Sequence, residues 1–466
     1  MKRPLFRGLF YEATRFASSI GPRGVKLEPE RKRMKIKFFA VENAPTFFVM
    51  LVLTCGLLLF GADSAASSLV ISIMVFVSVV TSVVVFRGVQ LSPFINLLLM
   101  LWGGFVALSF MAGRVEGAED EYLMLLSAVG VFGLGQFAGQ NSNRLQTAIR
   151  CFLLLGLLFS GFAFFQHLID KNMVLGVRKP YGLERLGGVF LSSNTAATFL
   201  GMIILLAVSN LWRTWLNQVS FSSSSGAILF VGAFQKMSLG VVICLFSFVS
   251  LLLTASRAGI AGTLLAVTVF SVWVTIQQLG GGQWVPKGRR GVRLILIASI
   301  VTLIVYIWSL SGDLVSTRYS QVFFDVRVRT DIIEASWQAF LMKPWFGYGL
   351  GGFDAARLLG ATPESNAVVV YVHAAHNVYM QWLVQVGIIG TAIFAAVYIY
   401  VLTRIFRGAR LARRYRTYCL AILCVSLLVG VHGIFDYALE IPVIMLCYAW
   451  LLGVGYGISV RYVSVR

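Results

Sequence analysis

The chain has 466 residues, of which 58% are apolar and only 12% are charged, and its formal net charge is +20. This composition excludes a soluble globular protein, whose surface would need far more charged side chains. In a soluble protein the positive charge would suggest nucleic acid as a partner. In a membrane protein it has another cause, because cytoplasmic loops collect lysine and arginine whatever the protein does. We therefore expect an all-α polytopic membrane protein and no nucleic-acid partner.

Apolar runs in the sequence predict about twelve transmembrane helices. A run of roughly 18 or more apolar residues is long enough to cross the hydrocarbon core as a helix. Such runs lie at about 45–62, 67–86, 91–112, 122–139, 147–168, 195–212, 237–255, 258–278, 292–310, 377–403, 417–437 and 442–459. The sequence therefore predicts a transmembrane domain over residues 41–466, preceded by a basic segment over residues 1–40.

The distribution of lysine and arginine predicts the orientation in the membrane. An even number of spans places both termini on one side, and the segments on that side hold 28 of the 39 basic residues. By the positive-inside rule this side is cytoplasmic. Residues 3–20 fit either a basic amphipathic helix on anionic lipid headgroups or a disordered tail. The opposite face holds the two long loops, about 169–194 and 311–376, the second of them between spans 9 and 10.

The second long loop is expected to contain a short amphipathic helix over residues 328–341. Lys343-Pro344 is predicted to end this helix, because the residue before a proline resists helical geometry. The glycine-rich segment 347–352 looks superficially like a nucleotide-binding loop. No strand precedes it, however, so we interpret it as a flexible or tightly packed loop.

Five candidate functional residues fall on the non-cytoplasmic face although they are far apart in sequence: Arg185, Arg257, Arg329, His373 and His376. Arg257 lies at the boundary between two spans. An arginine within the hydrocarbon costs at least ~2.5–3.5 kcal/mol, so Arg257 is expected to have a partner or a function. The alternative is that its side chain reaches the headgroups from a helix end.

Arg329 and Arg185 can each be explained in two ways. Arg329 stands near the start of the amphipathic helix, where the helix dipole disfavours a cation. Either an anionic ligand or a salt bridge with Asp331 would explain it, and the same holds less strongly for Arg327. Arg185 belongs to a cationic loop that would bind either an anionic ligand or anionic lipid.

His376, at the mouth of the tenth span, is the candidate proton acceptor, because a neutral imidazole can take up a proton near physiological pH. Its spacing from His373 would also suit a metal ion. Such a site needs further ligands, and the sequence offers only carboxylates nearby, so we expect no metal.

Several motifs together resemble the O-antigen ligase and polymerase family, over about residues 181–460. They are, in chain order, Arg185-Leu-Gly-Gly-Val-Phe190 with Asn194, then Ser256-Arg257-Ala258-Gly259, Arg329 through Trp337 with Pro344, Gly347 and Gly349, His376-Asn377 followed by Gly387-Ile-Ile-Gly390, and His432-Gly-Ile-Phe-Asp436. Relatives often place the first histidine of the pair two residues before the second, whereas here Ala374 and Ala375 intervene. The family's catalytic histidine therefore corresponds to His376.

The resemblance implies a metal-independent, cofactor-free glycosyltransferase of a bacterial inner membrane, with a periplasmic active site. Its donor would be a glycan on undecaprenyl diphosphate, and its acceptor a sugar hydroxyl of lipid A–core or of another lipid-linked glycan. Two arginines, Arg257 and Arg329, would hold the diphosphate, and His376 would accept the proton of the attacking hydroxyl, with inversion at the anomeric carbon. The residues expected to contact substrate are Arg185, Asn194, Asn377, Arg327 and His373.

The sequence leaves several functions open. O-antigen ligation to lipid A–core is the first, and polymerisation of O-antigen or exopolysaccharide repeat units is the alternative within the family. A protein-directed oligosaccharyltransferase is more distant. Outside enzymes, the chain would be a transporter of lipid-linked glycan or a scaffold of an envelope complex. Transporters often show inverted repeats and charged mid-membrane helices, and the sequence shows neither.

Overall fold

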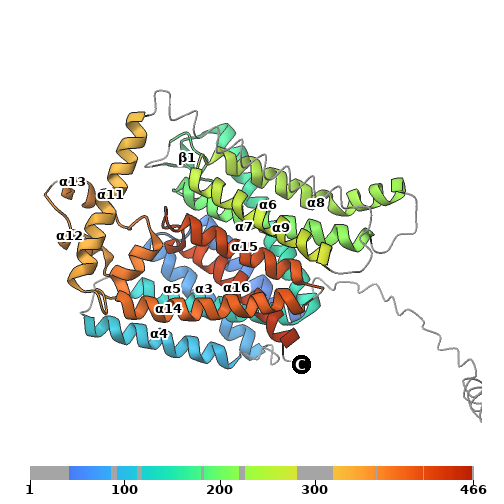
Figure 1. The fold of residues 1–466 in the computed structure, drawn as a ribbon, viewed down its shortest axis with the longest axis horizontal. Helices are drawn as coiled ribbons and strands as arrows, with labels where there is room; N and C mark the ends of the chain where they lie inside the picture. Colours follow the sequence, from blue (N-terminus) through green and yellow to red (C-terminus); the bar gives the residue numbers. More distant parts are fainter. Residues whose placement is uncertain are drawn as a thin grey trace, which may run out of the picture. The chain divides into compact units, whose positions relative to one another are not determined.

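The computed structural model describes residues 41–85, 92–112, 118–179, 183–219, 226–280, 319–363, 365–412 and 414–463, all within one compact unit, Phe38–Arg466 (Figure 1). This part of the chain is almost entirely helical. Nine of its helices are long and apolar enough to cross a membrane, and two shorter apolar stretches, Met237–Leu253 and Arg416–His432, accompany them. The predicted all-α, multi-pass fold is confirmed. The predicted N-terminal segment 1–40 and the predicted span 292–310 lie outside the described residues.

Each of the other eleven predicted spans coincides with a helix. These helices are α2 (Ala44–Leu58), α3 (Ala65–Val85), α4 (Pro93–Ala112), α5 (Glu119–Gln140), α6 (Ser142–Ile169), α7 (Ser193–Val219), α8 (Gly226–Leu253), α9 (Arg257–Gly280), α14 (Val378–Leu411), α15 (Arg416–His432) and α16 (Pro442–Val463). A short 3-10 helix, η1 (Val41–Asn43), leads into α2. α14 runs beyond its predicted end at 403, because arginines at the membrane boundary continue the helix without contributing to the apolar run.

The remaining elements lie in the two long loops and in the turn before α16. The first loop forms a hairpin of β1 (Met173–Val174) and β2 (Val177–Arg178). The second contains α11 (Tyr319–Met342), α12 (Phe353–Leu359) and α13 (Asn366–Val369). The predicted amphipathic helix is thus the C-terminal part of α11, and it ends directly before Lys343-Pro344 as expected. η2 (Ala438–Glu440) joins α15 to α16.

Helices α5 and α16, which both line the cavity described below, pack against each other through glycines. Gly135 and Gly139 on α5 face Gly453 and Gly457 on α16. A Cβ atom at any of the four would approach a backbone oxygen of the other helix to 2.1–2.5 Å. Small residues spaced by four allow membrane helices this close approach. The backbones of α5 and α16 are therefore held at a distance that only glycine permits.

Substitution of Gly453 by alanine is expected to destabilise the protein by about 1–3 kcal/mol, because the new Cβ would overlap a well-packed backbone. That Cβ would lie 2.1 Å from the carbonyl oxygen of Phe132. Gly161→Ala on α6 is the matched control, since nothing lies within 4 Å of its Cβ position. Thermal unfolding in detergent measures both variants. Equal melting temperatures for the two would contradict the close packing of α5 and α16.

The long helix α14 is broken at Gly387. This residue has φ 65° and ψ −171°, a conformation that is open essentially to glycine alone. The break deprives the next two backbone amides of their partners in the helix. They donate instead to the loop that follows α11, from Ile388 to the carbonyl of Pro344 at 2.8 Å and from Ile389 to that of Trp345 at 3.2 Å.

The same loop also satisfies the two carbonyls on the other side of the break. Val384 accepts a hydrogen bond from the amide of Tyr348 at 3.0 Å, and Gln385 accepts one from Gly349 at 2.8 Å. A Cβ at Gly347 would lie 2.5 Å from both of these carbonyl oxygens. Non-helical backbone at membrane depth must be satisfied by protein in this way. The interpretation of segment 347–352 as a tightly packed loop is confirmed.

Candidate functional site

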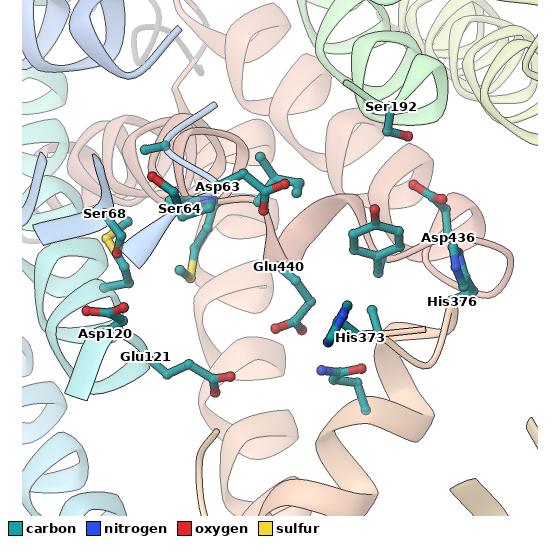
Figure 2. Close-up of a pocket in the computed structure, with 18 of the residues that line it drawn as sticks. Asp63, Ser64, Ser68, Asp120, Glu121, Ser192, His373, His376, Asp436 and Glu440 are labelled. Carbon is teal, nitrogen blue, oxygen red and sulfur yellow. The ribbon is translucent and has the colours of Figure 1, made fainter. Parts of the chain in front are cut away.

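A cavity of about 760 Å³ opens between the ends of α3, α5, α7, α14 and α16 (Figure 2). Its lining comes from five stretches of chain, namely 62–68, 120–125, 185–194, 371–385 and 436–445, together with Leu350. The charge count assigns every one of these stretches to the same membrane face as His376. Of the predicted site residues, Arg185, Asn194, His373 and His376 line this cavity, although they come from distant parts of the chain.

His376 is held in an unusual conformation inside this cavity. Its φ is 50°, and its ring meets that of Tyr437 edge-on with centroids 4.8 Å apart. Nδ1 is buried and has no hydrogen-bond partner among the described residues. Burial lowers the pKa of His376; the carboxylate of Asp436 raises it and the positive charge of Arg329 lowers it. The net direction is downward, so the imidazole is neutral at neutral pH and able to accept a proton.

A chain of hydrogen bonds connects the first long loop to Asp436. Figure 2 shows Asp436 next to His376. Arg185 donates from Nε to the carbonyl of Thr254 at 2.9 Å and from Nη2 to Oδ1 of Asn194 at 3.2 Å. Asn194 then donates from Nδ2 to Oδ1 of Asp436 at 3.1 Å. Asp436 is 1% exposed, and its Oδ2 has no partner in the described part of the chain. Asp436 thus lies between Asn194 and His376.

Left-handed backbone occurs beside each of three predicted site residues. Glu184, directly before Arg185, has φ 64°, and Ala255, two residues before Arg257, has φ 49°; His376 itself is the third. Such conformations cost about 1–3 kcal/mol for non-glycine residues and cluster where a site must hold a side chain in place. Three of the six non-glycine residues with positive φ in the described part of the chain thus lie at or within two residues of a predicted site residue.

Arg257 and Arg329 are not among the described residues that line the cavity. Arg257 is the first residue of α9, which Ser256 caps by accepting from the amide of Gly259 at 3.3 Å. Its side chain is exposed. It follows the turn in which the carbonyl of Thr254 accepts the hydrogen bond from Arg185. Arg329 is exposed on α11 and near enough to His376 to affect its pKa. Arg327, two positions earlier on the same helix, projects from a different side.

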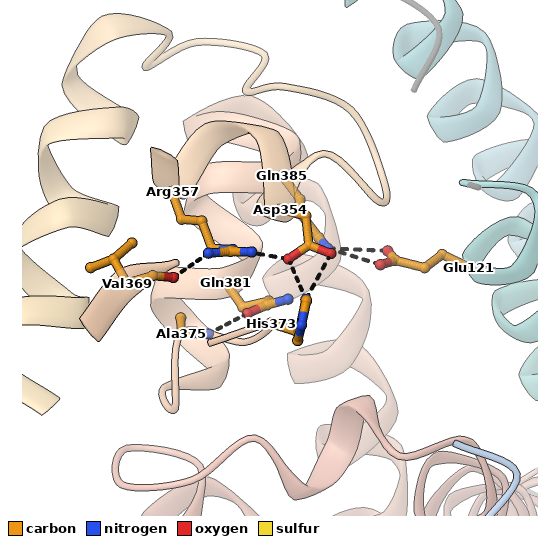
Figure 3. A network of polar contacts seen from close by, with 8 residues as sticks. All are labelled: Glu121, Asp354, Arg357, Val369, His373, Ala375, Gln381 and Gln385. Carbon is orange, nitrogen blue, oxygen red and sulfur yellow. Dashed lines mark hydrogen bonds and ion pairs between the residues drawn. The ribbon is translucent and has the colours of Figure 1, made fainter. Parts of the chain in front are cut away.

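The remaining two predicted contacts, His373 and Asn377, already have protein partners. His373 lies 3.1 Å from Oδ1 of Asp354, whose carboxylate also accepts from Nε of Arg357 at 3.0 Å (Figure 3). Asn377 caps α14 by accepting from the amide of Met380 at 3.0 Å. Its Nδ2 also donates to the carbonyl of Ile434 at 3.1 Å. Asn377 therefore fixes the turn that presents His376.

Sequence reasoning missed the carboxylates of the cavity. Besides Asp436, four line it: Asp63, Asp120, Glu121 and Glu440. Asp120 and Glu121 begin the same span, and Asp63 and Glu440 lie in turns between spans, so in the sequence all four look like ordinary loop acids. Their predicted location on one membrane face was the only signal that could have grouped them. Among the described residues, no three histidine, cysteine or acidic side chains are arranged to hold a metal ion.

One of these acids also anchors the loop that fills the break in α14. Glu121 accepts from the amide of Gly351 at 2.9 Å and from Nε2 of Gln385 at 3.1 Å (Figure 3). Nearby, Ser109 on α4 accepts from the amide of Leu350 at 3.0 Å. The cavity wall on α5 and the broken helix are thus joined by side-chain hydrogen bonds.

A second, apolar cavity of about 340 Å³ adjoins the first. It lies between α4, α5, α14, α15 and α16, and its walls are aromatic and aliphatic side chains such as Phe105, Phe132 and Phe394. Leu125, Trp382, Glu440 and Met445 line both cavities. A polar chamber and an apolar groove in the membrane region therefore share a wall.

A family model matches part of the chain. No curated protein matches the chain. Residues 242–395 match the family model described as O-Antigen ligase, and this segment holds Arg257, Arg329 and His376. Arg185, Asn194 and Asp436 lie outside it. The resemblance seen in the sequence is thus supported: the chain is a multi-pass membrane protein in which residues 242–395 match the O-Antigen ligase family model.

Proposed function

We propose that this protein transfers a glycan from undecaprenyl diphosphate to a sugar hydroxyl of lipid A–core, at the periplasmic face of a bacterial inner membrane. The transfer inverts the anomeric carbon and needs neither a metal ion nor a cofactor. Both termini are cytoplasmic. The observation that carries the proposal is the position of His376, in a cavity that a hydrogen-bonded arginine borders and an apolar groove adjoins.

The paired cavities match the two parts of a lipid-linked donor. The apolar groove offers aromatic and aliphatic walls to a polyprenyl chain, and each buried CH₂ group contributes about 0.8 kcal/mol. The polar cavity is wide enough for sugar rings. A molecule with an apolar tail, a charged linker and a glycan head would contact both at once.

The cations near the cavity suit the chemistry of the leaving group. A diphosphate gains negative charge as the glycosidic bond breaks, and guanidinium groups bind it through forked, charge-assisted hydrogen bonds. In this proposal Arg257 and Arg329 bind the diphosphate, and Arg185, Asn194 and Arg327 border the donor. His376 removes the proton of the attacking hydroxyl as the new bond forms. His373 and Asn377 lie at the acceptor's entry.

An assay with purified protein tests the reaction directly. The protein receives undecaprenyl-diphosphate glycan with rough lipopolysaccharide or with a second lipid-linked unit, without ATP and with a chelator present. Ligated lipopolysaccharide is the expected product. A lengthened lipid-linked glycan would instead identify a polymerase, and correctly folded protein that yields no product would reject the transferase proposal.

Substitution of Asp436 by asparagine is expected to extend activity to lower pH. The Asp436 carboxylate raises the pKa of His376, so its neutralisation lowers that pKa further. A proton acceptor works only when unprotonated, so the acidic limb of the rate profile should move downward. Asparagine can still accept the hydrogen bond from Asn194. A pH profile of the transfer rate measures the shift, and a limb that stays in place or moves upward would contradict it.

A further inference from the structure

One side of the polar cavity is strongly acidic. Asp63, Asp120, Glu121 and Glu440 line it with Ser68, and these five residues are called the acidic wall. Figure 2 shows the first three carboxylates and Ser68 away from His376 and Asp436, with Glu440 between the two groups. The whole chain has only 19 acidic residues against 39 basic ones. Four carboxylates in one cavity therefore require an explanation.

The arrangement of the acidic wall fits an extended ligand better than a single cation. In the described part of the chain these carboxylates do not form a group that would surround a metal ion. They come instead from the α2–α3 turn, from α5 and from η2. Each ionised carboxylate can accept about four hydrogen bonds. A wall of separate acceptors suits a molecule that carries several hydroxyl or ammonium donors.

Two buried polar atoms in the lining lack partners and point to the same kind of ligand. Ser68 is 4% exposed, and its Oγ has no hydrogen-bond partner among the described residues. The unpartnered Oδ2 of Asp436 stands at the other end of the cavity. An unsatisfied buried polar group is costly, and a hydroxylated ligand would supply the missing hydrogen bonds. Trp382 and Tyr371 add aromatic surface for sugar rings.

The acidic wall already resists additional negative charge. Burial and the neighbouring carboxyl of Glu121 raise the pKa of Glu440 to about 8. At neutral pH Glu440 therefore holds its proton, because a second negative charge beside Glu121 is unfavourable, and an anionic ligand would meet the same repulsion. A neutral sugar would avoid that repulsion, and an amino sugar would relieve it.

We propose that the acidic wall binds the acceptor saccharide and selects uncharged or amino-bearing sugars over phosphorylated or acidic ones. This inference rests on the proposed transferase function and names its acceptor class. It also orients the reaction. The donor diphosphate lies toward the arginines, the acceptor lies against Asp120 and Glu440, and His376 stands between the two substrates.

Three synthetic acceptors that differ in one substituent test the selection: an alkyl glucoside, the matching glucosaminide and the matching glucuronide. With full-length protein in nanodiscs, the KM for the glucuronide should exceed that for the glucoside at least tenfold, and the glucosaminide should match or improve on the glucoside. Asp120→Asn should narrow the gap by lowering the KM for the glucuronide, and Glu440→Gln should narrow it above pH 8, where Glu440 is ionised. If either variant fails to fold, Asp63→Asn is measured in its place, because Asp63 lies in an exposed turn.

The control is Glu42→Gln, in η1 outside the cavity lining, where the side chain accepts a hydrogen bond from Asn143 at 2.8 Å and lies near Arg144. It should leave the ratio of KM values unchanged. Transfer to all three acceptors with equal KM would overturn the selection while leaving the transferase intact. If none of the three reacts, the assay with rough lipopolysaccharide decides the proposed function, and direct binding of the three glycosides decides the inference. Weakest binding of the glucuronide would support the acidic wall as a sugar site, and equal binding would reject it.

Discussion

Replacement of His376 by alanine is expected to reduce the transfer rate at least ~10²-fold, the usual contribution of a positioned proton acceptor. The protein should still fold, because the ring has only an edge-on contact with Tyr437 and no hydrogen bond from Nδ1. The wild-type rate should fall on acidification only below the ordinary histidine pKa of 6.5, since the net effect of burial, Arg329 and Asp436 lowers the pKa of His376. Initial rates from pH 5 to pH 8 measure both effects.

His376→Asn is the matched variant, because the native residue has φ 50° and asparagine accepts left-handed backbone better than alanine does. It preserves the turn and removes the basic ring. Equal losses in both variants, with unchanged melting temperatures, would assign the defect to proton transfer. Full activity in His376→Asn would show that the imidazole is not the proton acceptor.

Gly387→Ala is expected to be among the most destabilising single substitutions in the chain. The positive φ costs about 1–3 kcal/mol for a residue other than glycine. Overlap adds a further ~1–3 kcal/mol, as in other overpacked sites. The new Cβ would lie 2.4 Å from the carbonyl oxygen of Trp345. The loop should leave the break, so transfer should fall together with the melting temperature.

The control for this substitution is Gly103→Ala on α4, where no atom lies within 4 Å of the Cβ position. Alanine favours a helix over glycine by up to ~1 kcal/mol, so this variant should be neutral or slightly more stable. Thermal unfolding of both proteins in the same detergent makes the comparison. A Gly387→Ala protein as stable as the control would mean that α14 has no break in solution.

The transmembrane helices could be predicted because a span carries its own signal, a long apolar run that no distant residue alters. An apolar run does not reveal a break in the helix within it, nor the short elements that lie in loops. Residues 377–403 read as one continuous span, and nothing apolar marks the change at Gly387. The short helices α12 and α13 and the β1–β2 hairpin were missed, because their form depends on what they pack against.

The candidate site, like the fold, could be predicted from the sequence only in part. Topology placed Arg185, Asn194 and His376 on one face, and the structure brings all three to one cavity. Arg257 and Arg329 remain at its edge. The sequence singles out Asp436 only as the end of the motif that begins at His432. In the structure Asp436 accepts a hydrogen bond from Asn194, and Nδ1 of His432 lies 2.6 Å from the hydroxyl of Thr198. These hydrogen bonds join residues more than two hundred positions apart, so the spacing of residues in the sequence does not predict them.

The broken helix also has a consequence for the order of assembly. The loop that fills the break at Gly387 precedes α14 in the chain, so it is already synthesised when that helix enters the membrane. Closing a short loop costs little entropy, and the backbone hydrogen bonds at Tyr348 and Gly349 can form at once. The glycine contact of α5 with α16 must wait for the C-terminal helix. The apolar groove between these helices is therefore completed last, after the turn that carries His376.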